Sequence, residues 1–162
     1  MKVFIIHGTG GSPDGNWFSW LKSELEKLGC EVFLPKFPTP NGQSLDSWMG
    51  VFDNYLDKVD EDTIFVGHSL GPAFLLYILE TIDIQIKAAY FVSGFLSLLG
   101  DEWFDTRNKT FVCRDFDWDK IKSKCKKFVV ISGDNDPYVP LDEAQPMKRQ
   151  LAKLPDKPRC LP

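Results

Sequence analysis

The segment at residues 67–71, Gly-His-Ser-Leu-Gly, constrains the fold of this chain more than any other. It fits the pattern G-x-S-x-G, in which a serine occupies a tight turn between a buried strand and a helix. The apolar run Thr-Ile-Phe-Val precedes it, and an Ala- and Leu-rich segment at 73–79 follows it. The two glycines permit a sharp turn because they carry no Cβ. The sequence therefore predicts Ser69 as an exposed nucleophile, rather than a residue of a plain strand-to-helix turn.

Apolar runs bounded by turn residues alternate with amphipathic patterns along the chain. We expect residues 95–118 to be irregular, and we expect one domain over residues 1–162 whose last residues, about nine, are atypical. Continuous apolar strands separated by helices are typical of a parallel α/β sheet covered on both faces, a three-layer sandwich. The runs predict five strands and five helices, the strands at 2–7, 31–34, 63–67, 86–93 and 128–132 and the helices at 16–28, 44–59, 71–82, 119–124 and 141–154.

Three polar clusters follow predicted strands, at residues 7–11, 67–71 and 133–139. In open parallel sheets, ligands bind beyond the carboxyl ends of the strands. Because the three clusters fall at the same edge of the predicted sheet, we expect them to meet there. Together they indicate an active site, which no single cluster would establish.

The loop at 133–139 offers a carboxylate to assist the serine. A serine nucleophile needs a base, usually histidine, and a carboxylate that orients that base. Both Asp134 and Asp136 lie in the loop, and we favour Asp136 because it lies deeper and Pro137 restricts its backbone. The alternative is an Asx-type turn with no chemical role.

An oxyanion formed at the serine would need two backbone N–H donors. We expect one from Leu70, at the start of the helix after the serine, and the other from the glycine-rich loop at 8–11, with Thr9 and Gly10 as candidates. A glycine-rich loop after a first strand could instead hold a phosphate. However, neither common phosphate-binding pattern matches this loop, so that alternative is weak.

Charge and cysteine content exclude several classes of function. The net charge of −4 provides no electrostatic footprint for nucleic acid or an anionic membrane. The four cysteines form no C-x-x-C pair and the chain has two histidines, so we expect no metal and no cofactor. Scattered cysteines and an apolar N-terminal run too short for a signal or a membrane span predict a cytoplasmic protein with reduced thiols.

Taken together, these motifs resemble the small serine hydrolases of the retinoblastoma-binding-protein type. The resemblance rests on HGTG at 7–10, the tryptophans at 17 and 20, GHSLG at 67–71 and SGDNDPYVP at 132–140, and it extends to DFDWDKIK at 115–122. It implies an α/β-hydrolase fold with a six-stranded parallel sheet. It also implies Ser69 as nucleophile, Asp136 as the triad acid and an esterase-like hydrolase activity.

The third triad member, a histidine, does not follow Asp136. A helix, a strand and two loops would place it roughly 27 positions further on, yet 26 residues follow Asp136 and none is histidine. The resemblance implies a Gly-His motif and a closing helix, where this chain reads LPDKPRCLP. We therefore expect a truncated or altered C-terminus that lacks the sixth strand and the last helix. His7 and His68 are expected to be structural, with His7 bracing the loop at 8–11.

Two functions follow from these expectations. The first is hydrolysis of a small carboxylic ester or similar acyl substrate through Ser69. Its pocket would be bordered by His7, Phe95, Leu96 and Trp103, although these aromatic side chains could simply cap the core. The second is a catalytically impaired hydrolase fold that binds a protein partner. Without a sixth strand, residues 128–132 would form an exposed apolar edge, which predicts pairing with a second copy.

Overall fold

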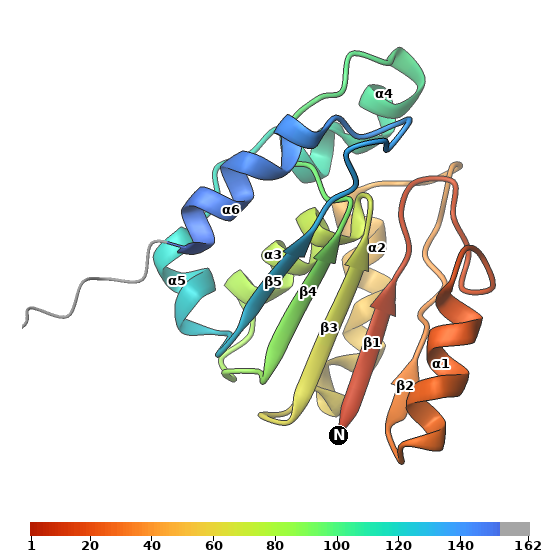
Figure 1. Cartoon of the computed structure of the whole chain (residues 1–162), viewed down its shortest axis with the longest axis vertical. Coiled ribbons are helices and arrows are strands. Elements are labelled where there is room, and N and C mark those ends of the chain that lie inside the picture. The colour runs from red at the N-terminus through yellow and green to blue at the C-terminus, as the bar shows by residue number, and fades with distance from the viewer. Residues whose placement is uncertain (153–162) are drawn as a thin grey trace, which may run out of the picture.

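The computed structural model describes residues 1–152, and its centre is a parallel sheet of five strands in the order β2-β1-β3-β4-β5. Each neighbouring pair is parallel. The central position of β1 and β3 brings the loops that follow them together at the upper edge of the sheet (Figure 1). The strands are β1 (Lys2–Ile6), β2 (Glu31–Phe33), β3 (Thr63–His68), β4 (Ala88–Val92) and β5 (Phe128–Ile131).

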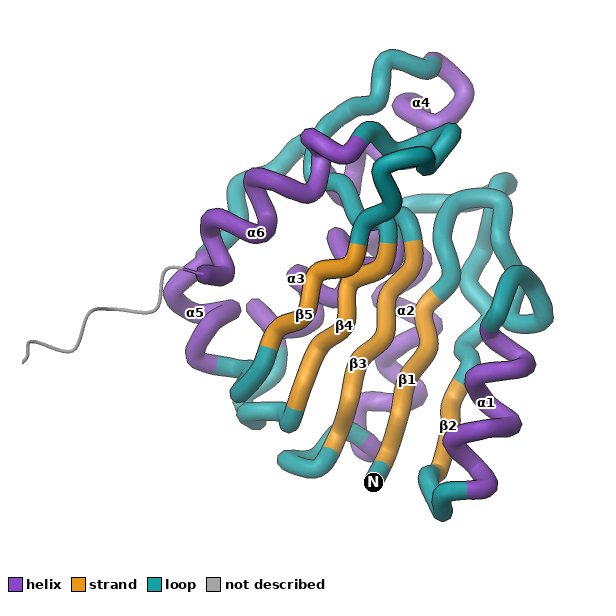
Figure 2. The backbone as a smooth tube through the Cα atoms, in the orientation of Figure 1, coloured by secondary structure: helices purple, strands orange, loops and turns teal. Residues whose placement is uncertain are grey.

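Helices cover the two faces of the sheet unequally. Helix α1 lies in front of β1 and β2, whereas α2 and α3 lie behind the strands (Figures 1 and 2). Helices α2 to α6 all contribute side chains to one core cluster with the back of the sheet. The helices are α1 (Phe18–Lys27), α2 (Leu45–Phe52), α3 (Gly71–Thr81), α4 (Glu102–Val112), α5 (Trp118–Ser123) and α6 (Ala144–Ala152), with short 3₁₀ helices η1 (Asp53–Lys58) and η2 (Leu141–Glu143).

The alternation of side chains in β1 divides the core into two clusters. Phe4 and Ile6 point to the back, into a cluster dominated by phenylalanines and Trp48. Val3 and Ile5 point to the front, toward Phe18 of α1. Successive side chains of a strand lie on opposite faces, so a strand buried on both faces reads as a continuous apolar run. The predicted α/β class and parallel sheet are confirmed.

Two helical predictions need correction. Helix α4 lies within the segment 95–118 that was expected to be irregular. The Asp101 carboxylate caps it by accepting from the N–H groups of Trp103 and Phe104, a signal that composition alone did not reveal. The helix predicted at 44–59 divides into α2 and η1, where the Asn54 side chain donates to the carbonyls of Gly50 and Val51.

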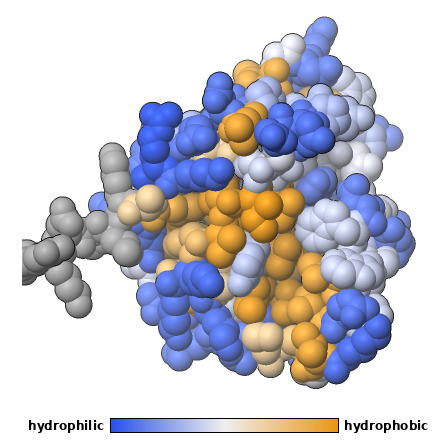
Figure 3. Space-filling model, viewed as in Figure 1, coloured by the Kyte–Doolittle hydropathy of each residue, from blue (hydrophilic) through white to orange (hydrophobic). Residues whose placement is uncertain are grey.

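The front face of the sheet is only partly covered by the described residues. An apolar groove of about 400 Å³ runs from α1 across the strands to the exposed side chain of Ile131 on β5. It is the continuous hydrophobic patch at the centre of Figure 3. The groove is lined by Val3, Trp17, Leu21, Leu25, Ile64, Val66, Tyr90, Val92 and Ile131.

The altered ending predicted from the sequence falls on residues 153–162, which lie outside the described part of the chain. Helix α6 is described as far as Ala152. Within residues 1–152, no helix is both long enough and apolar enough to span a bilayer.

Candidate active site

Ser69 lies on the turn between β3 and α3 with a φ of 59°, in the left-handed region. The turn is closely packed on both sides. A Cβ on Gly67 would lie 2.7 Å from the Pro72 nitrogen, and one on Gly71 would lie 2.7 Å from the Ile6 carbonyl oxygen. Any larger residue at either position would displace backbone. This is the geometry that the G-x-S-x-G pattern predicts, and the strained backbone is retained because its surroundings enforce it.

The glycine-rich loop after β1 packs directly against the serine. A Cβ on Gly8 would lie 2.6 Å from Ser69 Cβ and 2.9 Å from Ser69 Oγ. The parallel pairing of β1 with β3 brings the two loops together, because both strands end at the same edge of the sheet. The structure therefore joins the first two of the three predicted clusters.

The three predicted oxyanion donors differ in whether their N–H groups already have an acceptor. Among the described residues, neither the Leu70 N–H nor the Thr9 N–H has an acceptor. The Gly10 N–H, by contrast, donates to Thr39 Oγ1 at 2.6 Å. Leu70 precedes the first residue of α3, where the helix dipole favours negative charge. Of the three predicted donors, the amides of Thr9 and Leu70 therefore have no acceptor, whereas the Gly10 amide is already hydrogen-bonded.

His7 braces this loop from within the core. Its Nδ1–H donates to the Gly8 carbonyl at 2.9 Å, and its Nε2 accepts from the Phe37 N–H at 3.2 Å. These bonds require the neutral ring, and burial lowers the pKa of His7 despite the opposing hydrogen bond to Gly8. With both nitrogens engaged and the side chain 1% exposed, His7 is not placed to accept the Ser69 proton.

Asp136 is held by the loop that follows β5. Its Oδ1 accepts from the N–H groups of Tyr138 and Val139, each at 3.0 Å. Desolvation would raise the pKa of Asp136, but these two amides, the Ser93 hydroxyl and the charge of His68 together lower it. The carboxylate is therefore ionised at neutral pH. The two local bonds have the form of the Asx-type turn, which is compatible with either interpretation of this residue.

His68 lies beside the serine in sequence, but its imidazole faces the aromatic rings of Trp17 and Phe18. Its Nδ1 is buried with no hydrogen-bond partner among the described residues. Burial lowers the pKa of His68, and the charge of Asp136 only partly offsets this effect. Within residues 1–152, no group forms a hydrogen bond with Ser69 Oγ, so the described site contains no base in place.

Ser93 is a site residue that the sequence analysis missed. It follows β4 with a φ of 49°, and its hydroxyl is one of the groups that lower the pKa of Asp136. Its position in the sequence was the signal that could have identified it. Ser93 directly follows β4, and β4 lies between β3, which leads to Ser69, and β5, which leads to Asp136.

The four residues predicted to border a substrate pocket are divided between core and surface. His7 and Phe95 are 1% exposed and belong to the interior, which favours the core-capping interpretation for them. Leu96 is half-buried against the core. Trp103 is 44% exposed and lies near Gly10. Of the four residues, it is therefore the one that lies at the surface beside the loop at 8–11.

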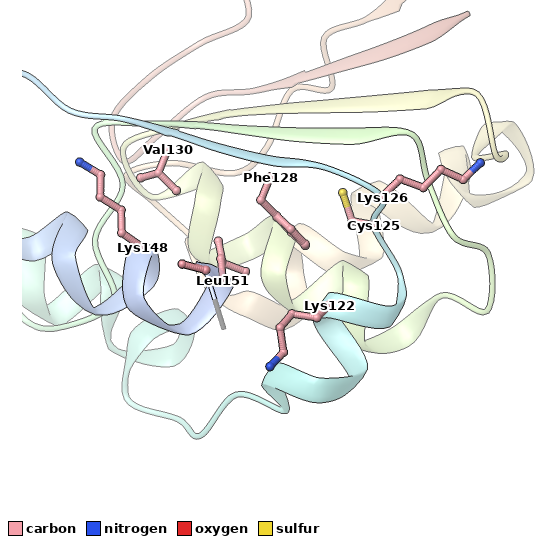
Figure 4. Close-up of a pocket in the computed structure, with 8 residues that line it drawn as sticks. Lys122, Cys125, Lys126, Phe128, Val130, Lys148 and Leu151 are labelled. Carbon is pink, nitrogen blue, oxygen red and sulfur yellow. The ribbon is translucent and has the colours of Figure 1, made fainter. Parts of the chain in front are cut away.

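Two hollows of the described structure have linings that do not include Ser69. One is the apolar groove on the front of the sheet. The other, about 410 Å³, lies between β5, α5 and α6, where Phe128, Val130 and Leu151 meet the lysines 122, 126 and 148 (Figure 4). No group of three or more His, Cys, Asp or Glu side chains within residues 1–152 could hold a metal ion.

Comparison with known proteins identifies relatives of the whole described domain. Residues 3–155 match the serine hydrolase family. The chain is 31% identical to serine hydrolase RBBP9 of Rattus norvegicus in an alignment 157 positions long, which covers 94% of this chain and 82% of that protein. It is also 31% identical to the putative hydrolase YdeN of Bacillus subtilis, covering 93% of this chain and 78% of that protein.

Solved structures agree with the architecture. The crystal structure of the ydeN gene product from B. subtilis superposes with a TM-score of 0.85 at 30% identity, covering 93% of this chain and 80% of that one. Est1E from Butyrivibrio proteoclasticus, in a structure with bound ferulic acid, has a TM-score of 0.70 at 19% identity, covering 92% and 75%. At that identity the second likeness establishes only the fold.

Proposed function

The chain belongs to the serine hydrolase family, and from this premise we propose that Ser69 carries out acyl transfer from a small carboxylic ester to water. The observation that carries the proposal is the packing of Gly8 against Ser69, which places a loop with an unoccupied amide beside the nucleophile. In the proposed reaction, Ser69 Oγ attacks the ester carbonyl and the alcohol leaves. Water then releases the acid.

The oxyanion of each tetrahedral intermediate would be held by the N–H groups of Thr9 and Leu70. Both belong to backbone that is already ordered, and Leu70 lies at the positive end of the α3 dipole. Donors fixed in advance need no reorganisation when charge develops, and one such donor contributes about 10²- to 10³-fold in kcat.

The limiting feature is the base. Neither histidine of the chain is placed to take the Ser69 proton, so in the present chain the proton would pass to solvent. Loss of one member of a triad lowers kcat by about 10⁴- to 10⁶-fold, and the remaining rate comes from the oxyanion donors and binding. We therefore propose that hydrolysis is slow unless a base is supplied, and that Asp136 is the acid that orients such a base.

Covalent labelling with a fluorophosphonate, followed in the wild type and in Ser69→Ala, tests the nucleophile. We expect slow labelling of the wild type at Ser69 and none of the variant. Added imidazole should accelerate labelling because it can act as the missing base, and Asp136→Asn should reduce that acceleration. Labelling equal in the wild type and in Ser69→Ala, with and without imidazole, would exclude the proposal.

A second candidate function is an interaction module, and we propose that a second copy pairs with β5. Among the described strands, β5 has β4 on one side and none on the other. Exposed Lys126 precedes the strand and exposed Asp134 follows it. In an antiparallel pair centred on Val130, Lys126 of one copy faces Asp134 of the other, so the edge is complementary in charge to itself.

Charge exchange provides the test of this dimer. Sedimentation over a concentration series should give a dimer for the wild type, a monomer for Lys126→Glu, and a dimer again for Lys126→Glu combined with Asp134→Lys. A monomeric wild type, or a double variant that stays monomeric while the wild type dimerises, would contradict the proposed pairing.

A further inference from the structure

A polar network behind the oxyanion loop links three segments that are distant in sequence. Thr9 and Gly10 belong to the loop, Thr39 and Gln43 to the segment before α2, and Asn108 to α4. None of these residues was singled out by sequence except the two in the loop. Their hydrogen bonds form one connected set.

Gln43 is the centre of this network. Its Nε2 donates to Thr9 Oγ1 at 3.1 Å and to Asn108 Oδ1 at 3.0 Å. Its Oε1 accepts from the Thr39 hydroxyl at 2.5 Å. The amide therefore uses both its donor and its acceptor ends, which defines the orientation of the side chain.

The network reaches the loop backbone through Thr39. The Thr39 hydroxyl donates to Gln43, so its oxygen is free to accept, and it accepts the Gly10 N–H. Gly10 has a φ of 68°, a conformation that favours glycine. The Thr9 side chain is held as well, because its hydroxyl donates to Asn108 Oδ1 at 2.5 Å.

Asn108 is the buried anchor. Its side chain is fully buried, on α4, and its Oδ1 accepts from both Thr9 and Gln43. Burying an amide is unfavourable unless it is hydrogen-bonded, and its Nδ2 has no partner within residues 1–152. A buried amide that keeps an unsatisfied donor destabilises the fold. The presence of Asn108 here therefore points to a role beyond packing.

The loop is consequently held from two sides. Gly8 rests on Ser69, and Gly10 is bound to Thr39. The residue between them, Thr9, carries the amide that has no acceptor. With its neighbours and its own side chain restrained, the direction of that amide is set by the protein before any substrate binds, as an oxyanion donor requires.

We infer that Gln43, with Thr39 and Asn108, forms a positioning network that preorganises the Thr9 amide for the oxyanion. The inference rests on the proposed function, because it assigns these side chains a role in the reaction of Ser69. None of the three touches substrate. They act through the loop, so their loss should slow reaction at Ser69 without changing the nucleophile or its turn.

The test compares fluorophosphonate labelling rates at Ser69 among folded variants. Gln43→Leu and Gln43→Glu both remove the donor to Thr9 and should label about 10- to 100-fold more slowly. Thr39→Val should be slowed as well, whereas Thr39→Ser, which keeps the hydroxyl, should retain nearly the wild-type rate. Thr63→Val is the matched control, because it removes a buried threonine hydroxyl at the opposite end of β3.

Amide hydrogen exchange at Gly10 provides a readout that does not need activity. The Gly10 N–H should be protected in the wild type, in Thr39→Ser and in Thr63→Val, and should exchange faster in Thr39→Val and Gln43→Leu. If the wild type is labelled no faster than Ser69→Ala, the proposed function is wrong. The hydrogen-exchange rates at Gly10 still show whether Thr39 and Gln43 hold the loop. Labelling of the Gln43 variants within twofold of wild type, or unchanged Gly10 exchange, would overturn the inference.

Discussion

The two sides of the candidate site differ in how firmly the protein holds them. On the nucleophile side, Ser69 and Gly8 are in contact, and behind them His7, Trp48 and Phe74 belong to a dense aromatic interior. On the acid side, the loop after β5 is largely exposed, and Asp136 accepts hydrogen bonds from two backbone amides.

The difference shows which parts of the candidate site are produced by the packing of the fold. The turn at Ser69 and the oxyanion loop follow from close packing, since no side chain fits at Gly8, Gly67 or Gly71 without displacing a neighbour. The acid depends on local hydrogen bonds, and it gains a chemical role only with a base beside it. The turn at Ser69 is therefore fixed by packing, whereas the position of Asp136 depends on hydrogen bonds within its own loop.

The largest expected effect is on the free energy of unfolding, which should fall much more when a side chain is removed behind Ser69 than when one is removed from β5. Trp48 is fully buried, stacks on Phe37 and donates its Nε1–H to the Pro38 carbonyl. Trp48→Ala should lower the free energy of unfolding by about 3–5 kcal/mol. Phe128→Ala in half-buried β5 should cost less, about 1–2 kcal/mol, because part of the ring is already in water. Urea denaturation measures both free energies. Equal losses in the two variants would contradict the difference in packing between the two sides of the site.

Next in size is the effect of a single methyl group at Gly8. Gly8→Ala places a Cβ against Ser69 and should slow fluorophosphonate labelling by roughly 100-fold, since small displacements of reacting groups have costs of this order. Gly50→Ala is the control, because a Cβ there meets nothing within 4 Å in α2. It should stabilise the fold by about 0.5–1 kcal/mol and leave labelling unchanged.

The two sides should also lose stability in different pH ranges. Burial lowers the pKa of His7 below its usual 6.5, so the unfolded chain takes up a proton more readily, and this contribution to stability declines as the pH falls below about 6.5. The pKa of Asp136 lies below its usual 3.8, so its contribution persists until the pH falls below about 4. Unfolding free energies measured from pH 8 to pH 3 should show a smaller first decline in His7→Gln, with the remainder due to His68, whose pKa is also lowered by burial. Asp136→Asn should reduce the second decline without removing it, because the pKa values of Asp60 and Asp62 are lowered as well.

The smallest effect is expected at the outer end of β5. Ile131 is 49% exposed, and Ile131→Thr should change the unfolding free energy by no more than about 0.5 kcal/mol. Ile5→Thr, at a front-facing position that is 2% exposed, should be far more destabilising. A large loss at Ile131 would mean that its side chain, which lines the groove on the front of the sheet, is covered in solution.

Local patterns were sufficient for the fold and for the turn at Ser69. Continuous apolar runs predicted the five strands, and GHSLG predicted the turn at Ser69, because both depend on residues adjacent in sequence. Helix α4 was missed because the composition of the segment is irregular, and the capping residue Asp101 was not recognised as the start of a helix. The catalytic roles of Ser69 and Asp136 remain predictions that the labelling experiment addresses.

By itself, the sequence determined that this chain forms a parallel α/β sheet of the serine hydrolase family with a serine on a strained turn. Short-range sterics and alternating burial impose these features wherever such a segment occurs. Only the tertiary structure decided that Gly10 is bound to Thr39, that Gln43 and Asn108 support Thr9, and that Ser93 lowers the pKa of Asp136. Those contacts join residues far apart in sequence, and they exist only after the sheet has brought the ends of its strands together.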